Sequence, residues 1–520
     1  MMAEFNYGID QLTIGIAVGL SKNSVKGVLS AAAIEKIRRS EQHVKTIIGT
    51  NTTVYGINTG FGILAHTKIS VEDTRLLQHK ILQSHSVGVG NPVPNEIAKL
   101  MMITKVHSLA QGYSGIRLET LHRILWHIEN DVIPVVPEKG SVGASGDLAP
   151  LAHLFLPLIG LGEVYYQGKR LKSAGMLREA GLEPLQLGPK EGLALINGTQ
   201  FILSYAVKAV QRMHNALEAA DIIGAMSLEA LTGTKAPFNE RLHALRPFTG
   251  NQLVAQRLRL LLHDSAIMQS HVDCGRVQDP YSLRCMPQVH GASRNAWLHL
   301  KMLTETELNS VTDNPIILDE SNTISGGNFH GQPLALPLDY ACFAASEIGN
   351  ISDRRCYLLL EGKWGLPLLL MSNVGLNSGF MIPQYTTAAL VTENKTLCFP
   401  ASADSIPTSL GQEDHVSMGS ISGRKLNQVL DNLDYILAIE LMSACQAIEF
   451  RQPLKSSEML EFAHDYVRQF VGFAQEDRIF ADDISLIGGI IRDFSFVDQV
   501  NAFAKRNSLN LNEGYDSFNI

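Results

Sequence analysis

Two long segments with helical periodicity constrain the fold more than any other feature of the sequence. In residues 425–450 apolar side chains recur at the 3.6-residue spacing of a helix. Residues 199–231 are apolar on more than one face, and the pattern ends at Thr232-Gly233, a typical helix stop. A helix that is apolar all round must be buried in a large core. A third helix is expected over about 293–312, before Pro315.

Strand signals are few, so the sequence predicts a mostly α architecture of long packed helices. Residues 163–171 indicate one small hairpin, with its turn at Gln167-Gly168. Hydrophobic residues make up 45% of the 520 residues and charged residues 18%, below the roughly 25% usual in soluble proteins. This composition supports a large buried core and excludes a disordered chain, and the length alone allows about three or four folding units.

Charge and cysteine content narrow the class of protein further. The net charge of −8 gives the chain no general electrostatic reason to bind nucleic acid or anionic lipid. Six cysteines without a C-x-x-C pair are typical of free thiols in a reducing compartment. Glu4 and Asp10 stand where a signal peptide would carry Lys or Arg, and no apolar run reaches the roughly 18 residues of a spanning helix. We therefore expect a cytoplasmic protein.

Four loops differ from the helices because they are dense in Gly, Ser, Asn and His. Loops held by a rigid scaffold are where binding and catalysis usually occur. The loops expected to carry the active site are 51–62, 84–92, 138–147 and 325–333.

The loop 138–147 contains Ala144-Ser145-Gly146, a tripeptide that can make its own electrophile. If the backbone bends sharply, the Gly146 nitrogen attacks the Ala144 carbonyl carbon and loss of water closes a five-membered ring. Loss of a second water from Ser145 leaves a methylene conjugated to that ring. Gly146 suits this approach because it has no Cβ. For the tripeptide alone, an ordinary tight glycine turn is the commoner explanation.

Asp147 follows the tripeptide and bears on two further interpretations. It is a plausible N-cap for a short helix over residues 148–156 that Pro157 would end, and the positive end of that helix would stabilise negative charge on the ring. It also stands where a G-x-S-x-G nucleophile elbow requires glycine, which argues against a serine hydrolase.

The run Gly-Ser-Val-Gly-Ala-Ser-Gly-Asp-Leu-Ala-Pro-Leu-Ala-His closely resembles the signature of the aromatic amino acid ammonia-lyases, and most closely that of its histidine-specific members. Six further motifs resemble that family in the same order. They are Tyr-Gly-Ile-Asn-Thr-Gly-Phe-Gly at 55–62, Leu-Ile-Asn-Gly-Thr at 195–199, Gln-Asp-Pro-Tyr-Ser-Leu-Arg-Cys at 278–285, Glu-Leu-Asn-Ser-Val-Thr-Asp-Asn-Pro at 307–315, Gly-Gly-Asn-Phe-His-Gly at 326–331 and Gln-Glu-Asp-His-Val-Ser-Met at 412–418.

The resemblance implies a long-helix bundle of the ammonia-lyase and fumarase-aspartase type with a loop-built active site. It further implies that the tripeptide becomes 4-methylidene-imidazol-5-one (MIO), which captures the substrate amine so that ammonia can leave.

We expect one lyase, with a loop region in 1–200 and a helical core in 201–520. The resemblance implies a homotetramer in which several chains contribute to each site. The motifs indicate no metal or nucleotide cofactor, since zinc spacings, a P-loop and G-x-G-x-x-G are missing from the sequence.

The resemblance also assigns roles to residues around the tripeptide. Tyr55 would remove the β-proton, and Tyr281 would line the site near the cofactor. Asn197 would hydrogen-bond the ring oxygen or the substrate carboxylate, although an ordinary helix cap is the alternative. Arg284 would clamp that carboxylate through a bidentate fork, although a surface ion pair is the commoner role of a lone arginine. Gln278, Tyr281 and Arg284 would share one face if they lay on a helical turn.

Substrate choice depends on His85 and Glu413, while Phe329 would pack against the ring or the substrate. Histidine at the position of His85 goes with polar rings in the family. A carboxylate at Glu413 suits an imidazole N–H, and a phenol does not need it. We therefore expect L-histidine as substrate and urocanate with ammonia as products. Ser86 also suits a tyrosine lyase, so tyrosine stays an alternative, as does an inactive helical homologue with a structural role.

Overall fold

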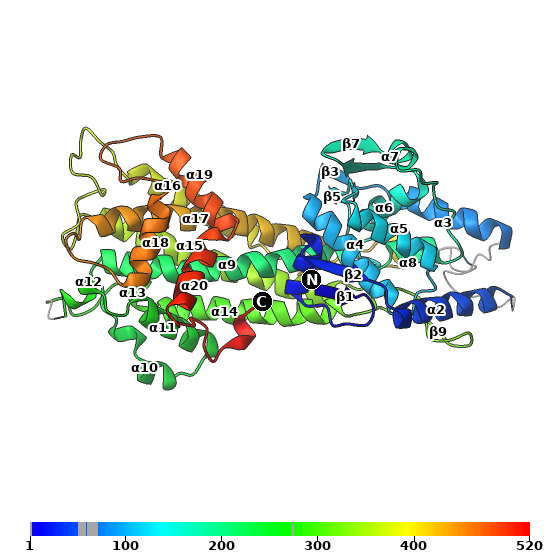
Figure 1. Cartoon of the computed structure of the whole chain (residues 1–520), viewed down its shortest axis with the longest axis horizontal. Helices are drawn as coiled ribbons and strands as arrows, with labels where there is room; N and C mark the ends of the chain where they lie inside the picture. The colour runs from blue at the N-terminus through cyan, green and yellow to red at the C-terminus, as the bar shows by residue number, and fades with distance from the viewer. Residues whose placement is uncertain (1–2, 50–58, 60–70, 273–274) are drawn as a thin grey trace. The chain divides into compact units, whose positions relative to one another are not determined.

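The computed structural model describes residues 3–49, 59, 71–272 and 275–520 (Figure 1). Contacts divide the chain into two units, which are described separately. Unit 1 contains the chain up to Lys208 together with Lys301–Leu338 and Pro400–Arg424. Unit 2 contains Ala209–Leu300, Asp339–Phe399 and Lys425–Ile520. The division near residue 200 that the sequence suggested stays a prediction.

Unit 1 combines short helices with small sheets. Its elements are β1 (Ala3–Asn6), α1 (Ile14–Ser21), β2 (Val25–Val28), α2 (Ala31–Gly49), α3 (Val71–His85), β3 (Val89–Pro92), α4 (Asn95–Ala110), α5 (Leu118–Glu129), β4 (Ile133–Pro134), β5 (Pro137–Lys139), α6 (Leu148–Phe155), η2 (Leu156–Ile159), β6 (Glu163–Tyr166), β7 (Lys169–Lys172), α7 (Ser173–Glu179), α8 (Glu191–Ile196), β8 (Ile316–Ile317), β9 (Thr323–Ile324) and η4 (Ser409–Gly411).

Helix α4 is the centre of unit 1, because every residue from Ile97 to Ala110 is buried. It packs against α1, α2, α5 and α6. The predicted hairpin is confirmed as β6 and β7, which pair antiparallel around Gln167 and Gly168 at φ 49° and 74°. Pairing of β3 with β5 brings the loops 84–92 and 138–147 side by side.

Unit 2 contains most of the longer helices. Four helices run from one unit into the other: α9 (Gln200–Ala230), α14 (Met286–Leu308), α15 (Gln332–Leu360) and α17 (Gly419–Glu449). The remaining elements are η3 (Ala236–Phe238), α10 (Glu240–Ala244), α11 (Thr249–Leu261), α12 (Ala266–Gln269), α13 (Tyr281–Arg284), α16 (Met381–Leu397), α18 (Glu458–Arg468), α19 (Phe480–Arg492), α20 (Ser495–Arg506) and η5 (Asp516–Phe518).

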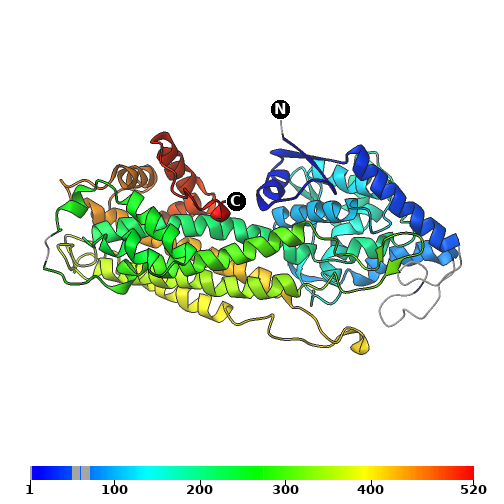
Figure 2. The same cartoon turned by 90° about the horizontal axis from the view of Figure 1, so that it is seen from below.

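Within unit 2 the long helices lie side by side (Figure 1 and Figure 2). Buried Glu440 of α17 joins three of them, because it accepts hydrogen bonds from Ser227 of α9 at 2.7 Å and from Arg355 of α15 at 2.5 and 2.9 Å. The mostly α prediction is confirmed, as are the helices expected over 199–231 and 425–450. The third helix ends earlier than expected, at Leu308, where the Asn309 side chain binds both backbone groups of Leu12.

The expected thiols are found at the five cysteines that the structure describes, all of which are free. No helix in the described ranges is both long enough and apolar enough to cross a lipid bilayer.

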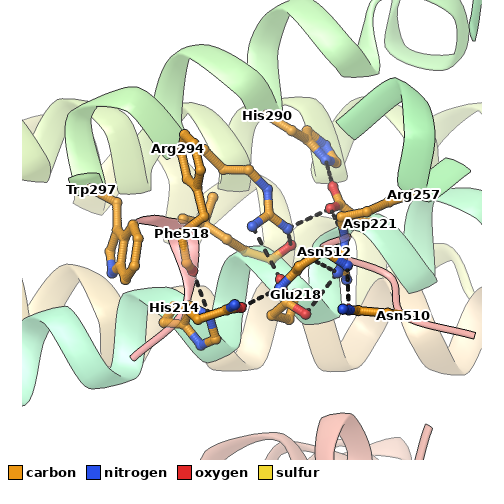
Figure 3. A network of polar contacts seen from close by, with 12 residues as sticks. His214, Glu218, Asp221, Arg257, His290, Arg294, Trp297, Asn510, Asn512 and Phe518 are labelled. Atoms are coloured by element: carbon orange, nitrogen blue, oxygen red, sulfur yellow. Dashed lines mark hydrogen bonds and ion pairs between the residues drawn. The ribbon is translucent and has the colours of Figure 1, made fainter. Parts of the chain in front are cut away.

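A buried network of charges connects α9, α11 and α14 in unit 2 (Figure 3). Arg257 binds Glu218 at 2.9 Å and Asp221 at 2.8 Å, and Arg294 binds the same carboxylates at 3.1 and 2.5 Å. His290 adds a contact to Asp221 at 2.8 Å. With a neutral histidine the two guanidinium groups balance the two carboxylates, which is how buried charges become tolerable in a core.

The C-terminal segment is anchored to the same network. Asn512 accepts a hydrogen bond from Arg257 at 2.7 Å, and the Phe518 carbonyl contacts His214 at 3.1 Å. The Phe518 ring also stacks on Trp297, with 6.3 Å between the ring centroids. The last residues of the chain are therefore part of the unit 2 core.

The difference in the free energy of unfolding between wild type and His214→Gln should depend on pH. Burial lowers the pKa of His214 from 6.5 to about 4, against the opposing attraction of Glu218. Neutral His214 therefore contributes stability above about pH 6.5, and this contribution is lost as pH falls toward 4. In urea unfolding the gap between wild type and His214→Gln should change by about 1–3 kcal/mol over that range.

The control is His263→Gln, which changes an exposed histidine in the same unit. It shows how the loss of an exposed histidine affects the free energy of unfolding over the same pH range. A constant gap between wild type and His214→Gln would show that His214 binds the same number of protons in the folded and unfolded chains.

Candidate active site

The tripeptide loop lies in unit 1 between β5 and α6, and its backbone requires glycine. Gly143 and Gly146 have φ values of 75° and 71°, in the left-handed region that favours glycine. A Cβ on Gly146 would lie 2.1 Å from the Gly198 carbonyl oxygen, and one on Gly143 would lie 2.2 Å from Ser417 Oγ. The loop is therefore tightly bent and closely packed, as the ring-closure hypothesis requires.

Gly198 binds the backbone of the tripeptide loop on both sides. Its N–H donates to the Ser145 carbonyl at 3.3 Å, and its own carbonyl accepts from the Asp147 N–H at 2.8 Å. These bonds form a parallel bridge between Gly146 and Gly198. The Ser145 carbonyl oxygen, which would become the ring oxygen, thus already has a hydrogen-bond donor.

Asn197 lies beside this bridge with its side chain almost fully buried. Asn197 is the C-cap of α8 and does not open the long helix α9, which begins at Gln200. The reason is Gly198, whose φ of 132° separates α8 from α9. Within the described part of the chain, Asn197 Oδ1 accepts no hydrogen bond. This buried acceptor is available to a group bound next to the tripeptide.

Asp147 occupies the predicted N-cap position of α6, but its carboxylate does not cap that helix. It accepts instead from Ser141 Oγ at 3.0 Å and from the Ile202 N–H of α9 at 2.9 Å. Burial raises the pKa of Asp147 to about 7, and these hydrogen bonds oppose the rise. Helix α6 ends at Phe155, close to the predicted end, and continues as the 3₁₀ turn η2 that contains Pro157.

A cavity of about 240 Å³ opens beside the tripeptide, and both predicted selectivity residues line it together with Ala144 and Gly146. Glu413 Oε1 accepts from Ser145 Oγ at 3.3 Å, and Glu413 Oε2 accepts from Thr408 Oγ1 at 2.9 Å. Burial lowers the pKa of His85, while the Glu413 carboxylate opposes that change. The structure therefore places an imidazole and a carboxylate around one small space next to the Ala144-Ser145-Gly146 tripeptide.

The other predicted site residues are not brought together in this way. Phe329 lies half-buried in the turn before α15 and is not part of the cavity lining. In unit 2, Arg284 stacks over the Tyr281 ring at 4.5 Å on α13. The expected shared face fails for Gln278, because Pro280 is the N-cap and the helix begins only at Tyr281.

Tyr55 lies outside the described residues, so its predicted role as the base stays a prediction.

Several functional neighbours were missed by the sequence analysis. Thr408 and Ser141 hold carboxylates of the site, but single hydroxyl residues in loops carry no distinctive signal. Lys105 is more informative, since it is a cation within the otherwise apolar run of α4, and its Nζ donates to the Asn197 carbonyl at 2.5 Å. Lys190 is also fully buried, and it binds Asp313 at 2.5 Å.

No cluster of three or more His, Cys, Asp or Glu side chains in the described residues is arranged to hold a metal ion.

Comparison with known proteins identifies the class. The sequence pattern of the family described as aromatic amino acid lyase matches residues 12–469. The chain therefore belongs to this family, and the resemblance seen in its motifs is confirmed. This membership makes the protein an ammonia-lyase type of carbon–nitrogen lyase.

Curated relatives and solved structures agree with this assignment. The chain is 46% identical to histidine ammonia-lyase of Pseudoalteromonas atlantica, over 94% of this chain and 97% of that protein. It is 46% identical to histidine ammonia-lyase of Natranaerobius thermophilus, over 91% and 94%. The crystal structure of histidine ammonia-lyase from Trypanosoma cruzi superposes with a TM-score of 0.89 at 41% identity, covering 96% of each chain. Tyrosine aminomutase from Streptomyces globisporus superposes with a TM-score of 0.91 at 32% identity, covering 96% and 99%.

Substitution of Gly146 by Ala should destabilise the protein by more than the cost of placing an alanine at a positive φ. The added Cβ would clash with the Gly198 carbonyl as well as strain the backbone. Gly181→Ala is the matched control, because Gly181 has a φ of 68° and a Cβ there meets no atom within 4 Å. In thermal unfolding, Gly181→Ala should cost about 1 kcal/mol and Gly146→Ala at least about 2 kcal/mol. Equal losses would contradict a close approach between the two glycines.

Proposed function

We propose that this protein is a histidine ammonia-lyase, which converts L-histidine to trans-urocanate and ammonia. The observation that carries the proposal is the pairing of His85 and Glu413 around the cavity beside Ala144 and Gly146. The 46% identity to histidine ammonia-lyases over most of the chain supports the same substrate.

We also propose that Ala144, Ser145 and Gly146 form MIO. The Gly146 nitrogen bonds to the Ala144 carbonyl carbon with loss of one water, and Ser145 loses a second. The bent backbone and the tight contact of Gly146 with Gly198 support the formation of such a ring. When formed, the ring supplies an electrophilic methylene to which the substrate amine adds.

Recognition of the imidazole depends on the state of Ser145. Before ring formation the Ser145 hydroxyl donates to Glu413 Oε1. Loss of that hydroxyl removes this donor and leaves Oε1 to accept a hydrogen bond from an imidazole N–H, while Thr408 keeps hold of Oε2. Maturation of the ring therefore prepares the carboxylate for the substrate.

The remaining roles follow the family resemblance. Tyr55 removes the β-proton, and Arg284 clamps the substrate carboxylate through its guanidinium fork. Tyr281 and Gln278 line the site near the cofactor and the carboxylate. Phe329 packs against the ring or the substrate, and the Asn197 side-chain amide donates to the ring oxygen or the substrate carboxylate.

The two units work as one lyase in a cytoplasmic homotetramer, in which several chains contribute to each site. No metal or nucleotide takes part in this mechanism.

Substitution of Ser145 by Ala should abolish activity, because the ring would have no hydroxyl to eliminate. Intact-mass spectrometry should find the wild-type chain lighter than its sequence by two waters, and Ser145→Ala should not show that full loss. Ammonia release from histidine should fall by at least about 10³-fold, within the range that covalent and electrostatic catalysis supply. The control is Ser485→Ala, an exposed site on α19. Full activity in Ser145→Ala would refute the mechanism.

Substitution of Glu413 by Gln should impair histidine turnover more than tyrosine turnover. The amide loses the negative charge that favours an imidazole N–H but keeps a similar shape. We expect kcat/KM for histidine to fall about 10–100-fold, with a smaller change for tyrosine. Asp414→Asn is the matched control, because it removes an adjacent and exposed carboxylate. Equal losses on the two substrates would contradict the role given to Glu413.

A side-by-side assay of histidine, tyrosine and phenylalanine, read by the ultraviolet absorption of the unsaturated product, tests the substrate directly. Preferred turnover of tyrosine would favour the alternative tyrosine lyase. No turnover and no mass loss would favour an inactive homologue.

A further inference from the structure

Lys105 is a buried cation that the mechanism above does not use. It lies on α4 in unit 1 with only 1% of its surface exposed. A buried ammonium is costly unless it meets acceptors, so its contacts indicate why the position carries a lysine. Its Nζ donates to the backbone carbonyl of Asn197 at 2.5 Å.

This contact connects the lysine to the tripeptide through a single peptide group. The peptide between Asn197 and Gly198 receives the Lys105 hydrogen bond on its oxygen and donates from its N–H to the Ser145 carbonyl at 3.3 Å. Because peptide resonance couples the C=O to the N–H, a positive charge on the oxygen side makes the N–H a stronger donor.

We propose that Lys105 is a positioning residue that polarises the Asn197–Gly198 peptide and thereby stabilises negative charge on the Ser145 carbonyl oxygen. This inference rests on the proposed function, since it concerns formation and use of the ring. Lys105 touches neither the tripeptide nor the cavity lining. It acts through the Gly198 N–H.

The charge on the Ser145 oxygen matters during ring closure. The Gly146 amide nitrogen is a poor nucleophile until it loses its proton, and the resulting negative charge lies largely on the Ser145 oxygen of the same peptide. The nitrogen then bonds to the Ala144 carbonyl carbon. The Ala144 oxygen leaves as water with the two protons given up by the Gly146 and Ser145 amide nitrogens, and a C=N bond forms to the Ser145 nitrogen. A polarised Gly198 N–H lowers the free energy of the charged amide and so speeds closure.

The same oxygen accepts electron density when the finished ring reacts with an amine. A hydrogen-bond donor that is already in place stabilises that charge without reorganisation. One lysine therefore assists both the making of the ring and its use.

The groups around Lys105 set its pKa, and so decide at which pH it is charged. Burial lowers the pKa of Lys105 to about 7, and Lys190 adds to this effect, whereas the Asp313 and Asp147 carboxylates oppose it. Asp313 is directly bound to Lys190 at 2.5 Å, so its charge is shared between the two lysines. Lys105 donates to a neutral carbonyl, where its charge polarises a peptide and is not cancelled by a direct ion pair.

The test compares Lys105→Met, which removes donor and charge, with Lys105→Gln, which keeps an N–H donor without the charge. The full-length chains are made by cell-free synthesis, and the loss of two waters is followed over time by intact-mass spectrometry. Circular dichroism checks that each variant is folded. Both variants should form the ring at least about tenfold more slowly than wild type.

The matched control is Lys99→Met. Lys99 lies on the same helix, is buried to a similar degree and is bound to Asp131, yet it has no contact with Asn197. Lys99→Met should lose the two waters at the wild-type rate. Ring formation at the wild-type rate in Lys105→Gln would overturn the role of the charge. An equal slowing in Lys99→Met would show that ring formation does not depend on the contact between Lys105 and the Asn197 carbonyl, and would overturn the proposal.

A second measurement follows the near-ultraviolet absorption of the conjugated ring between about pH 6 and 8.5 in wild type and in Lys105→Gln. Asp147, whose pKa burial raises to about 7, titrates in the same range in both proteins. A shift that wild type shows and Lys105→Gln lacks should therefore report the loss of the Lys105 proton. Equal shifts in the two proteins, or a constant band in both, overturn the proposal. A wild-type chain that never loses two waters would instead refute the proposed function.

Discussion

The backbone contact between Gly146 and Gly198 is the constraint on which the candidate site depends. Two segments more than 50 residues apart approach so closely that a Cβ on Gly146 would lie 2.1 Å from the Gly198 carbonyl oxygen. The Gly198 carbonyl and N–H then bind the peptides on both sides of Gly146. This arrangement fixes the tripeptide in a bent form and places a donor on the Ser145 oxygen. The elements that supply the two segments, α6 on one side and α8 with α9 on the other, are held together by the Asp147 carboxylate.

Both units contain buried charged side chains, and these charges are stabilised differently in each unit. In unit 2 two arginines and two carboxylates bind one another directly, and the balanced set anchors the C-terminal segment (Figure 3). In unit 1 Lys105 and Asp147 bind backbone groups, so their charges act on peptides beside the tripeptide. A paired charge mainly specifies packing. A charge that meets a peptide also changes the chemistry of that peptide.

The sequence predicted those parts of the molecule that local pattern determines. The apolar periodicity of 199–231 and 425–450 gave two long helices, and Gln167-Gly168 gave the hairpin turn, because spacing and turn chemistry are local properties. The presence of His85 and Glu413 in one cavity is not local, since it depends on how the end of α3 and the 400–424 segment meet the tripeptide loop. Family resemblance supplied that pairing in advance. Asn197 and Gln278 were misplaced because a glycine in one case and a proline in the other set helix boundaries that periodicity does not reveal.

Reaction class and substrate choice have separate physical origins in this chain. The proposed electrophile requires the Ser145 hydroxyl, small neighbours, a bent backbone and a donor on one carbonyl oxygen. The proposed substrate choice requires two side chains, His85 and Glu413, which are contacted by Ser84 at the end of α3 and by Thr408. The glycine bridge consists of main-chain hydrogen bonds, so neither of these two side chains is one of its members. The Ser145 hydroxyl is the direct link between the two sets, because it donates to Glu413. The same fold is found in a histidine ammonia-lyase and in a tyrosine aminomutase, so its main-chain frame accommodates different cavities.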